Sequence, residues 1–192
     1  MKLITTELDG VWIIEPQVHV DNRGFFMESY NDAFVRGLGI PSAFVQDNHS
    51  LSKEAGTLRG LHFQSAPRAQ TKLVRAASGA IYDVAVDIRP RSATFGRWVG
   101  VILSADNRRQ LLIPQGFAHG FCTLVPNTEV LYKVDDYYSR EHDGGVAWDD
   151  PDLGIPWPFA QPVLSEKDGR HPRLRDLSPN ANTEADKEAD AV

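Results

Sequence analysis

The feature that most constrains this chain is a series of short apolar runs separated by turn residues. In AIYDVAVDI (80–88), Tyr82 and Val84 lie on one face of an extended chain, and Asp83 and Asp87 lie on the other. Four further runs, RWVGVILS, RRQLLIP, GFCTLV and EVLYKV, are rich in β-branched or aromatic residues, and segments such as SGA, PQG and VPNTE punctuate them. Many short strands at this spacing predict an all-β sandwich or barrel.

Helix is expected at one place only. In NDAFVRGLGI (31–40), Asn31 is a plausible N-cap, and Gly37 or Gly39 would end the helix. Prolines after residue 148 exclude long regular elements. Residues 178–192 contain no aromatic residue and four acids against one lysine. We therefore expect a single domain over residues 1–177 and a flexible tail over 178–192.

Composition excludes several classes of function. The net charge of −6 argues against non-specific nucleic-acid binding, which needs a basic face. No apolar run is long enough to span a membrane. The N-terminal MKLITTELDG lacks the apolar stretch of a signal peptide, and the single cysteine, Cys122, can form no internal disulfide. We expect a cytoplasmic protein in which Cys122 is a small buried hydrophobe.

Two glycine-containing stretches each carry a histidine: RGLHFQ (59–64) and IPQGFAHGF (113–121). The second contains P-x-G-x-x-H, which resembles the second motif of cupins, whose Pro-Gly turn aims the histidine into a small β-barrel. Such a barrel can enclose one ligand. On the residues alone, the histidine of RGLHFQ could be a core residue, a metal ligand or a proton-transfer base.

The usual cupin metal site uses two histidines spaced H-x-H, a nearby glutamate and the histidine of the second motif. Here Gln64 occupies the second position of H-x-H, and no glutamate follows within the next several residues. Only His62 and His119 remain as obvious donors, and a metal needs more. We therefore expect no metal.

Taken together, the motifs resemble the dTDP-4-dehydrorhamnose 3,5-epimerase family of metal-free cupins. The similar stretches run from Asp21 to Asp168: DNRGFFMESY, FVQDNHSLS, LRGLHFQ, QTKLV, DVAVDIRPRSATFGRW, LSADNRRQLLIPQGFAHGF, LYKVDDYYS, WDDPDLGIPWP and LSEKD. The resemblance implies a cupin-type jelly-roll β-barrel with a few short helices. It also implies a homodimer with exchanged N-terminal strands, no cofactor, and a dTDP-linked 4-keto-6-deoxyhexose as substrate in dTDP-rhamnose synthesis.

The family's reaction inverts carbons beside a ketone. It needs a base on one face of the sugar, a cation or donor at the carbonyl oxygen, and an acid on the other face. His62 suits the base, because imidazole titrates near neutral pH. The resemblance assigns Asp168 as its partner, Lys72 to the C4 oxygen and Tyr132 as the acid. On the residues alone, Lys72 could reach solvent and Tyr132 could be a core tyrosine.

The resemblance also implies a substrate-binding set, in which arginines suit phosphate oxygens and aromatic rings suit the thymine. The set is Arg23, Phe26, Glu28, Gln46, Asp47, Asn48, Arg59, His119, Tyr138, Asp143 and Lys167. Glu141 is an alternative to Asp143. The other histidines are expected to be structural or on the surface: His19, His49, His142 and His171.

Two questions stay open at this point. Arg59 and His62 would point to opposite faces of a straight strand, so both can reach one pocket only if the strand bends, and Gly60 is a reasonable place for that. The same catalytic set could also serve a single-centre 5-epimerase or a ketoisomerase. A non-catalytic nucleotide-sugar-binding cupin and a metal-dependent cupin are less favoured alternatives.

Overall fold

The computed structural model describes residues 1–40 and 43–177. Its strands are β1 (Lys2–Thr5), β2 (Trp12–Glu15), β3 (Val18–Asp21), β4 (Gly24–Met27), β5 (Gln46–Ser52), β6 (Leu58–Gln64), β7 (Lys72–Ser78), β8 (Ala80–Asp87), β9 (Trp98–Ser104), β10 (Gln110–Ile113), β11 (Phe117–Thr123), β12 (Thr128–Val134) and β13 (Asp143–Gly145). The helices are α1 (Asp32–Arg36) and the short 3-10 turns η1 (Asp168–Arg170) and η2 (Leu174–Asp176). The predicted mostly-β fold is confirmed.

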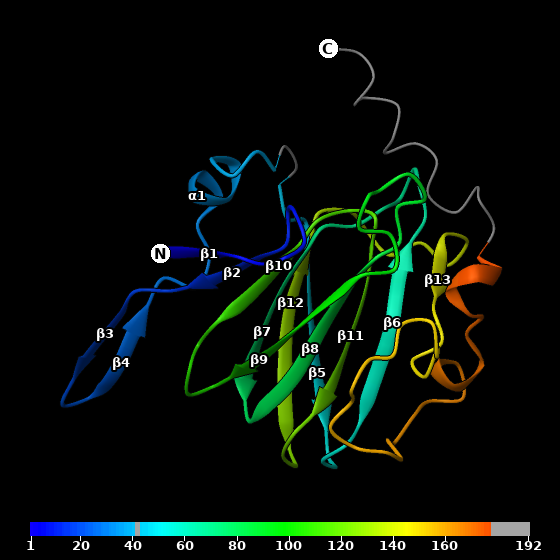
Figure 1. Cartoon of the computed structure of the whole chain (residues 1–192). Helices are drawn as coiled ribbons and strands as arrows, with labels where there is room; N and C mark the ends of the chain where they lie inside the picture. The colour runs from blue at the N-terminus through cyan, green and yellow to red at the C-terminus, as the bar shows by residue number, and fades with distance from the viewer. Residues whose placement is uncertain (41–42, 178–192) are drawn as a thin grey trace.

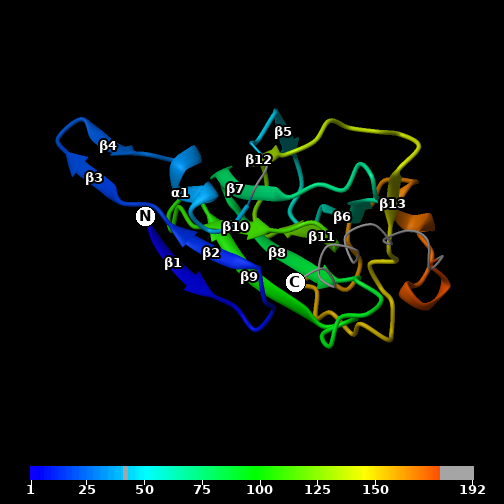
Figure 2. The ribbon, with the colours of Figure 1, turned by 90° about the horizontal axis from the view of Figure 1, so that it is seen from above.

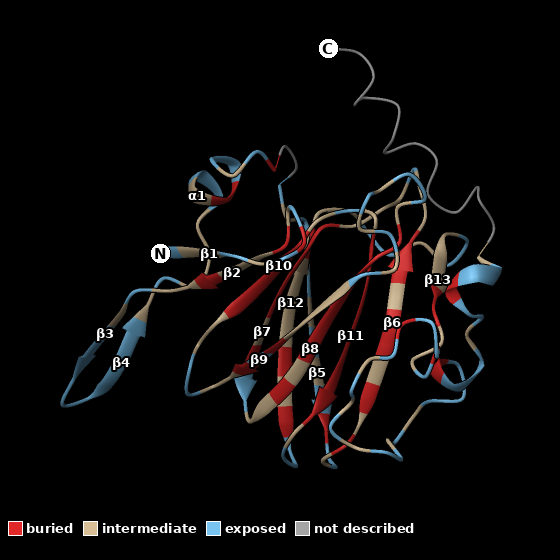
Figure 3. Ribbon diagram, in the orientation of Figure 1, coloured by how far each residue is buried: buried red, intermediate tan, exposed pale blue. Residues whose placement is uncertain are grey.

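Two antiparallel sheets face each other (Figures 1 and 2). One has the strand order β1-β2-β10-β7-β12-β5, and the other has the order β13-β6-β11-β8-β9. A buried cluster fills the space between them, with Val74 and Val130 from the first sheet and Ile81 and Phe121 from the second. Burial is concentrated on these central strands (Figure 3). Among the described residues the strand pairings leave both sheets open, so hydrogen bonds do not close them into one barrel.

Strand β8 is buried on both faces. Its inner face carries Ile81, Ala85 and the carboxylate of Asp83 into the space between the sheets. Its outer face carries Val84 and Val86, which the segment after β13 covers with residues such as Leu153 and Leu174. The expected alternation of residues is present, yet the polar positions are not in solvent. A buried aspartate between two sheets needs a partner.

The predicted helix is present and short. Asn31 caps α1, because its side-chain oxygen accepts a hydrogen bond from the Phe34 amide at 3.0 Å, and the helix ends at Gly37. After residue 148 the structure has no helix longer than η1 and η2 within the described range, as the prolines predicted. The predicted tail, 178–192, lies outside the described residues. None of the described helices has the length and apolar character needed to cross a membrane.

Strands β3 and β4 form a hairpin that projects away from the two sheets (Figures 1 and 2). Its apolar side chains are unusually exposed: Val20 is 76% exposed, Phe25 55% and Phe26 72%. Apolar side chains gathered on a projecting element usually mark a contact surface.

Candidate active site

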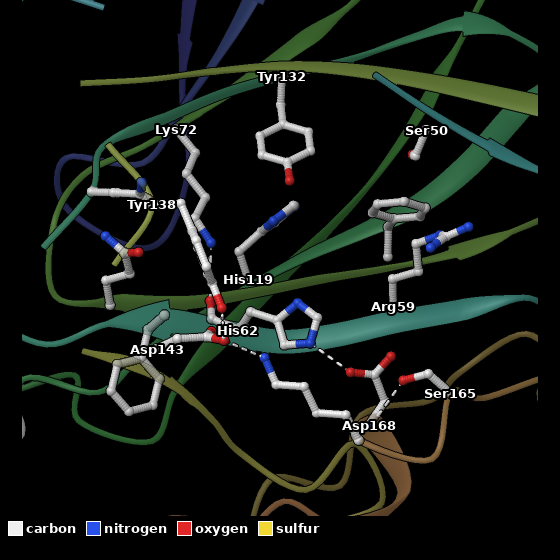
Figure 4. A pocket seen from close by; sticks show the side chains of 15 residues that line it. Ser50, Arg59, His62, Lys72, His119, Tyr132, Tyr138, Asp143, Ser165 and Asp168 are labelled. Carbon is white, nitrogen blue, oxygen red and sulfur yellow. Dashed lines mark hydrogen bonds and ion pairs between the residues drawn. The ribbon is translucent and has the colours of Figure 1, made fainter. Parts of the chain in front are cut away.

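A pocket of about 350 Å³ opens at one end of the space between the sheets (Figure 4). It collects nine of the fifteen residues that the sequence singled out: Arg59, His62, Lys72, His119, Tyr132, Tyr138, Asp143, Lys167 and Asp168. The other lining residues are Ser50, Phe63, Gln64, Gln70, Phe121 and Ser165.

His62 and Asp168 form a hydrogen-bonded pair at the base of the pocket. His62 comes from β6, and its Nε2 lies 2.5 Å from Oδ1 of Asp168, the first residue of η1. The His62 ring is half-buried and Asp168 is buried, with its amide donating to Ser165 Oγ at 3.1 Å. Because Nε2 is engaged by the carboxylate, Nδ1 is the ring nitrogen left for a substrate.

Burial sets the protonation of this pair. Desolvation lowers the pKa of His62 below its ordinary value, although Asp168 works in the opposite direction. Burial alone would raise the pKa of Asp168, but the neighbouring imidazoles of His171 and His62 outweigh it and hold that pKa well below its usual range. At neutral pH the pair is therefore a neutral imidazole and a carboxylate, which is the state that can accept a proton.

Lys72 points its ammonium group into the same space. It is the first residue of β7 and is buried, with Nζ donating to the backbone oxygen of His62 at 3.0 Å. Burial lowers its pKa to about 8, and the carboxylates of Asp143 and Asp83 counter part of that effect. The lysine does not reach out to solvent, so it can place a positive charge beside a developing oxyanion.

Tyr132 faces His62 from the opposite sheet. It lies on β12, and Figure 4 shows its hydroxyl pointing toward the centre of the pocket, with His62 on the far side. Burial raises the pKa of the phenol, with Asp143 adding to the rise and Arg59 opposing it. The phenol therefore keeps its proton at neutral pH and is a potential proton donor.

Gly60 allows Arg59 and His62 to share this pocket. Its φ is +127°, and the pairing of β6 with β11 shifts register opposite it, between His119 and Phe121. An added Cβ at Gly60 would lie 2.5 Å from the Gly120 Cα, so only glycine fits. The irregularity expected at Gly60 is confirmed, as a shift in register within the continuous strand β6.

His119 has a buried partner that the sequence analysis did not name. Its Nε2 lies 2.7 Å from Oδ1 of Asp83 on β8, and both side chains are buried. Asp83 lies on the polar face of the alternating stretch 80–88, so a buried partner for it could have been sought there. This second histidine–aspartate pair lies next to the first, because His119 and His62 are cross-strand neighbours.

A polar cluster lines the pocket entrance. Asp143 Oδ2 accepts from the Tyr138 hydroxyl at 3.0 Å and from Lys167 Nζ at 2.5 Å. Tyr138 is 59% exposed, so its ring is available at the rim. Glu141 is exposed and does not line the pocket, which favours Asp143 over the alternative.

Three predicted binding residues on β5 do not line the pocket. Gln46 and Asn48 lie next to its rim, where Gln46 accepts from the Tyr138 amide at 3.3 Å and donates to Asn48 at 2.9 Å. Asp47 points to the other face of the strand and pairs with Lys133 at 2.7 Å. The structure therefore does not bring Asp47 to the pocket, because side chains alternate along a strand.

Three further predicted residues, Arg23, Phe26 and Glu28, are also absent from the pocket lining. Arg23 and Phe26 belong to the projecting hairpin and Glu28 follows it, and all three are exposed. The Arg23 guanidinium donates a hydrogen bond to the Asp21 carboxylate of the same hairpin. Within one copy of the chain these residues do not contribute to the pocket.

The metal prediction can be tested against the donor set. Gln64 is occupied in holding loops: it donates to the backbone oxygen of Arg68 at 2.6 Å and accepts from the Ser139 amide at 2.7 Å. The cupin-type ligand set is thus incomplete here. The described residues do include one group of three donors, His62, Asp168 and His171. His171 was expected to be structural or on the surface, and its side chain is only 9% exposed, which fits the structural alternative.

Comparisons with known proteins identify the relatives of this chain. The sequence profile of a family described as dTDP-4-dehydrorhamnose 3,5-epimerase matches residues 5–176. A curated enzyme of that name from Salmonella typhimurium is 56% identical over 176 residues, covering 91% of this chain and 96% of that protein.

Two solved structures are similar to this chain in both sequence and fold. A dTDP-4-dehydrorhamnose 3,5-epimerase from Bacillus anthracis, solved with TDP and PPi bound, has 59% identity and a TM-score of 0.87, covering 90% of this chain and 98% of that one. A dTDP-6-deoxy-D-glucose-3,5-epimerase from Legionella pneumophila, solved with dTDP-4-keto-L-rhamnose, has 47% identity and a TM-score of 0.89, covering 94% and 96%. With a profile match over nearly all of the described residues and relatives above 50% identity, this chain belongs to the dTDP-4-dehydrorhamnose 3,5-epimerase family.

Proposed function

We propose that this chain is an isomerase that inverts C3 and C5 of dTDP-4-dehydro-6-deoxy-D-glucose to give dTDP-4-dehydro-L-rhamnose. The observation that carries the proposal is the opposition of two groups across one pocket. His62, paired with Asp168, lies on one sheet, and the Tyr132 hydroxyl lies on the other. Lys72 lies on β7, next to the strand of Tyr132, and reaches across the pocket to the backbone oxygen of His62.

The first step is proton removal beside the ketone. Nδ1 of His62 takes the proton from the sugar carbon, and the C–H electron pair moves into the enolate, placing negative charge on the C4 oxygen. The Asp168 carboxylate stabilises the imidazolium that forms. The Lys72 ammonium stabilises the oxyanion, and its buried position strengthens that interaction.

The second step is proton return on the opposite face. Tyr132 donates its hydroxyl proton to the carbanionic carbon, which inverts the centre, and the phenolate and the imidazolium then exchange protons with solvent. Only protons and electron pairs within the sugar move, so the balance requires no oxidant. Repeating the cycle at the other carbon beside the ketone inverts the second centre.

His119 supports binding rather than proton transfer in this proposal. The Asp83 carboxylate engages its Nε2 and fixes the ring, leaving the imidazole as a polar group beside the sugar. Arg59, Lys167 and Tyr138 in the pocket lining provide positive charge and an aromatic surface for the diphosphate and the thymine.

The projecting hairpin supports a homodimer. Arg23, Phe26 and Glu28 are exposed and away from the pocket of their own chain, so they can contribute to substrate binding only if a second copy brings its pocket to them. The exposed Val20 and Phe25 supply apolar surface for such a contact. We also infer a cytoplasmic location, which suits a chain whose single cysteine, Cys122, is free and buried.

The deciding experiment is incubation with the 4-keto sugar nucleotide in heavy water, followed by NMR of the product. A 3,5-epimerase incorporates deuterium at C3 and at C5 and inverts both. Deuterium at one centre only indicates a single-centre epimerase, a keto group moved to C3 indicates a ketoisomerase, and binding of dTDP without exchange indicates a non-catalytic protein. Any of these three results contradicts the proposal.

A further inference from the structure

The imidazole of His171 has no part in the proposed reaction, yet it lies against the catalytic pair. Its side chain is only 9% exposed, and its Nε2 lies 3.6 Å from Oδ1 of Asp168. The ring meets that of His62 edge to face, with centroids 5.5 Å apart and planes 77° apart. Its Nε2 makes no hydrogen bond to another described residue. A buried nitrogen whose nearest acceptor lies beyond hydrogen-bond distance needs an explanation.

Three donor atoms converge at this point. His62, Asp168 and His171 each offer one donor atom, and the three atoms lie within 4.8 Å of one another. Ligands of tetrahedral zinc lie about 2.0–2.2 Å from the metal, which places them roughly 3.3 Å apart. Oδ1 of Asp168 lies 2.5 Å from Nε2 of His62 and 3.6 Å from Nε2 of His171, so the two distances lie on either side of that value. Two imidazoles, one carboxylate and an open fourth position form a typical zinc donor set.

The surroundings hold His171 toward Asp168. A Cβ added at Gly145 would lie 2.5 Å from the His171 ring, so β13 packs directly on the imidazole and leaves no space behind it. The two lysines nearest this group, Lys167 and Lys72, each have an oxygen partner that offsets part of their positive charge. Lys167 is paired with Asp143, and Lys72 donates to a backbone oxygen. Two lysines near the group will nonetheless limit the affinity for a cation.

We propose that His62, Asp168 and His171 form an inhibitory binding site for Zn²⁺ or a similar divalent transition metal. The metal takes the place of the proton between Nε2 of His62 and Oδ1 of Asp168. That proton moves through solvent to Nδ1, so the imidazole stays neutral and no net proton is released. A neutral imidazole that coordinates through Nε2 carries its one N–H proton on Nδ1. Nδ1 is the atom that must accept the substrate proton, so an occupied site removes the base. The inhibition rests on the proposed function, whereas the binding does not.

Metal binding can be measured without substrate. Chelator-treated protein is titrated with Co²⁺, whose visible absorption reports four-coordinate nitrogen and oxygen ligation, and with Zn²⁺ by calorimetry. We expect one metal per chain. The variant His171→Asn is expected to bind about a hundredfold more weakly. The control His142→Asn, whose wild-type ring bonds Ser139 at 2.7 Å, is expected to bind like the wild type. Equal Zn²⁺ affinity in His171→Asn and wild type would overturn the site.

Inhibition is then measured with each protein relative to its own rate without metal. Zn²⁺ is expected to inhibit wild type and His142→Asn, with reversal by chelator, and to need about a hundredfold more metal for His171→Asn. Equal inhibition of all three proteins would indicate that Zn²⁺ acts on the substrate diphosphate, and it would overturn the proposal. An inactive wild-type protein that still shows the Co²⁺ spectrum would remove the epimerase function and leave the metal site standing.

Discussion

Nε2 of His62 and Oδ1 of Asp168 lie 2.5 Å apart although the two residues are 106 positions apart in the sequence. Strand β6 supplies the histidine, and the short turn η1 supplies the aspartate from the segment that covers the outer face of the same sheet. The pair therefore forms only when this C-terminal segment has packed onto the sheet. Burial of the outer face, with Leu153 and Leu174 in its core, is thus coupled to assembly of the proposed base.

The first prediction concerns that base. His62→Ala should lower proton exchange at both sugar carbons by about 10³-fold, since a positioned general base contributes roughly 10²–10⁴. Deuterium incorporation followed by NMR measures it. His49→Ala is the matched control, because His49 is an exposed histidine hydrogen-bonded to Glu129 and lies outside the pocket lining. Wild-type exchange in His62→Ala would remove this residue from the base role.

The second prediction separates the acid from the base. In Tyr132→Phe the base can still remove a proton and return one from the same face, so exchange should continue while inversion falls by about 10²-fold or more. The measurement compares deuterium content with the stereochemistry of the product. Tyr137→Phe, at a tyrosine that is 58% exposed and outside the lining, should behave like the wild type. Equal loss of exchange and inversion in Tyr132→Phe would contradict separate roles.

The third prediction is the pH dependence of kcat/KM. His62 must be neutral, and its pKa is lowered by burial, so activity should fall only as the pH drops through a value below the usual pKa of about 6.5. Lys72 must be protonated, so activity should also fall as the pH rises through about 8. Tyr132 does not cause the fall in activity at alkaline pH (the alkaline limb), because burial raises the pKa of its phenol.

A variant tests the assignment of the alkaline limb. Arginine stays charged to far higher pH than lysine, so Lys72→Arg should lower kcat but move the alkaline limb upward and out of the measured range. An unchanged alkaline limb in Lys72→Arg would assign that titration to another group.

The sequence predicted the strands well because their burial follows local patterns. The stretch 80–88 became β8, and the cap at Asn31 began α1. The polar face of β8 was harder to interpret. Alternation suggests a solvated face, but the opposite sheet covers Asp83 and His119 pairs with it. Pairing across sheets depends on contacts between distant residues, which local periodicity does not encode.

The candidate site could be predicted only in part, for a related reason. The residues gathered in the pocket come from strands and turns whose motifs are contiguous, such as RGLHFQ. Asp47 was placed with its neighbours Gln46 and Asn48, although alternation along β5 turns it to the other face. The sequence left open whether His171 is structural or on the surface, because η1 and the covering segment have no periodic pattern that signals a buried side.

The fourth prediction concerns the close approach at Gly60. Alanine there would meet the Gly120 Cα at 2.5 Å and the His119 oxygen at 2.7 Å, with a φ that favours glycine. Gly60→Ala should lower the free energy of unfolding by about 3 kcal/mol or more. Urea unfolding measures it. Gly169→Ala, where the added methyl meets nothing within 4 Å, should change stability by less than about 1 kcal/mol. Similar losses in both variants would show that backbone approach is not the cause.

The fifth prediction tests whether the projecting hairpin completes the pocket of a second copy. Arg23→Ala should raise KM, because a phosphate ligand is lost, and His62→Ala should abolish kcat. In a mixed dimer, the pocket of the Arg23→Ala chain keeps its own His62 and receives Arg23 from the His62→Ala chain. That site is intact. Random assortment makes half of the dimers mixed, so unfolding and refolding the two variants together should restore about a quarter of the wild-type sites.

The outcome depends on which chain supplies Arg23 to each pocket. Titrating active sites in the refolded mixture at substrate concentrations far below the KM of Arg23→Ala isolates the restored sites from the weakened ones. A mixture of His62→Ala with Lys72→Ala is the matched control, because both residues line the pocket of one chain and no mixed dimer then contains an intact site. If the Arg23 mixture shows no more activity than the sum of its separate variants, the hairpin does not serve a neighbouring pocket, and Arg23, Phe26 and Glu28 leave the binding set together.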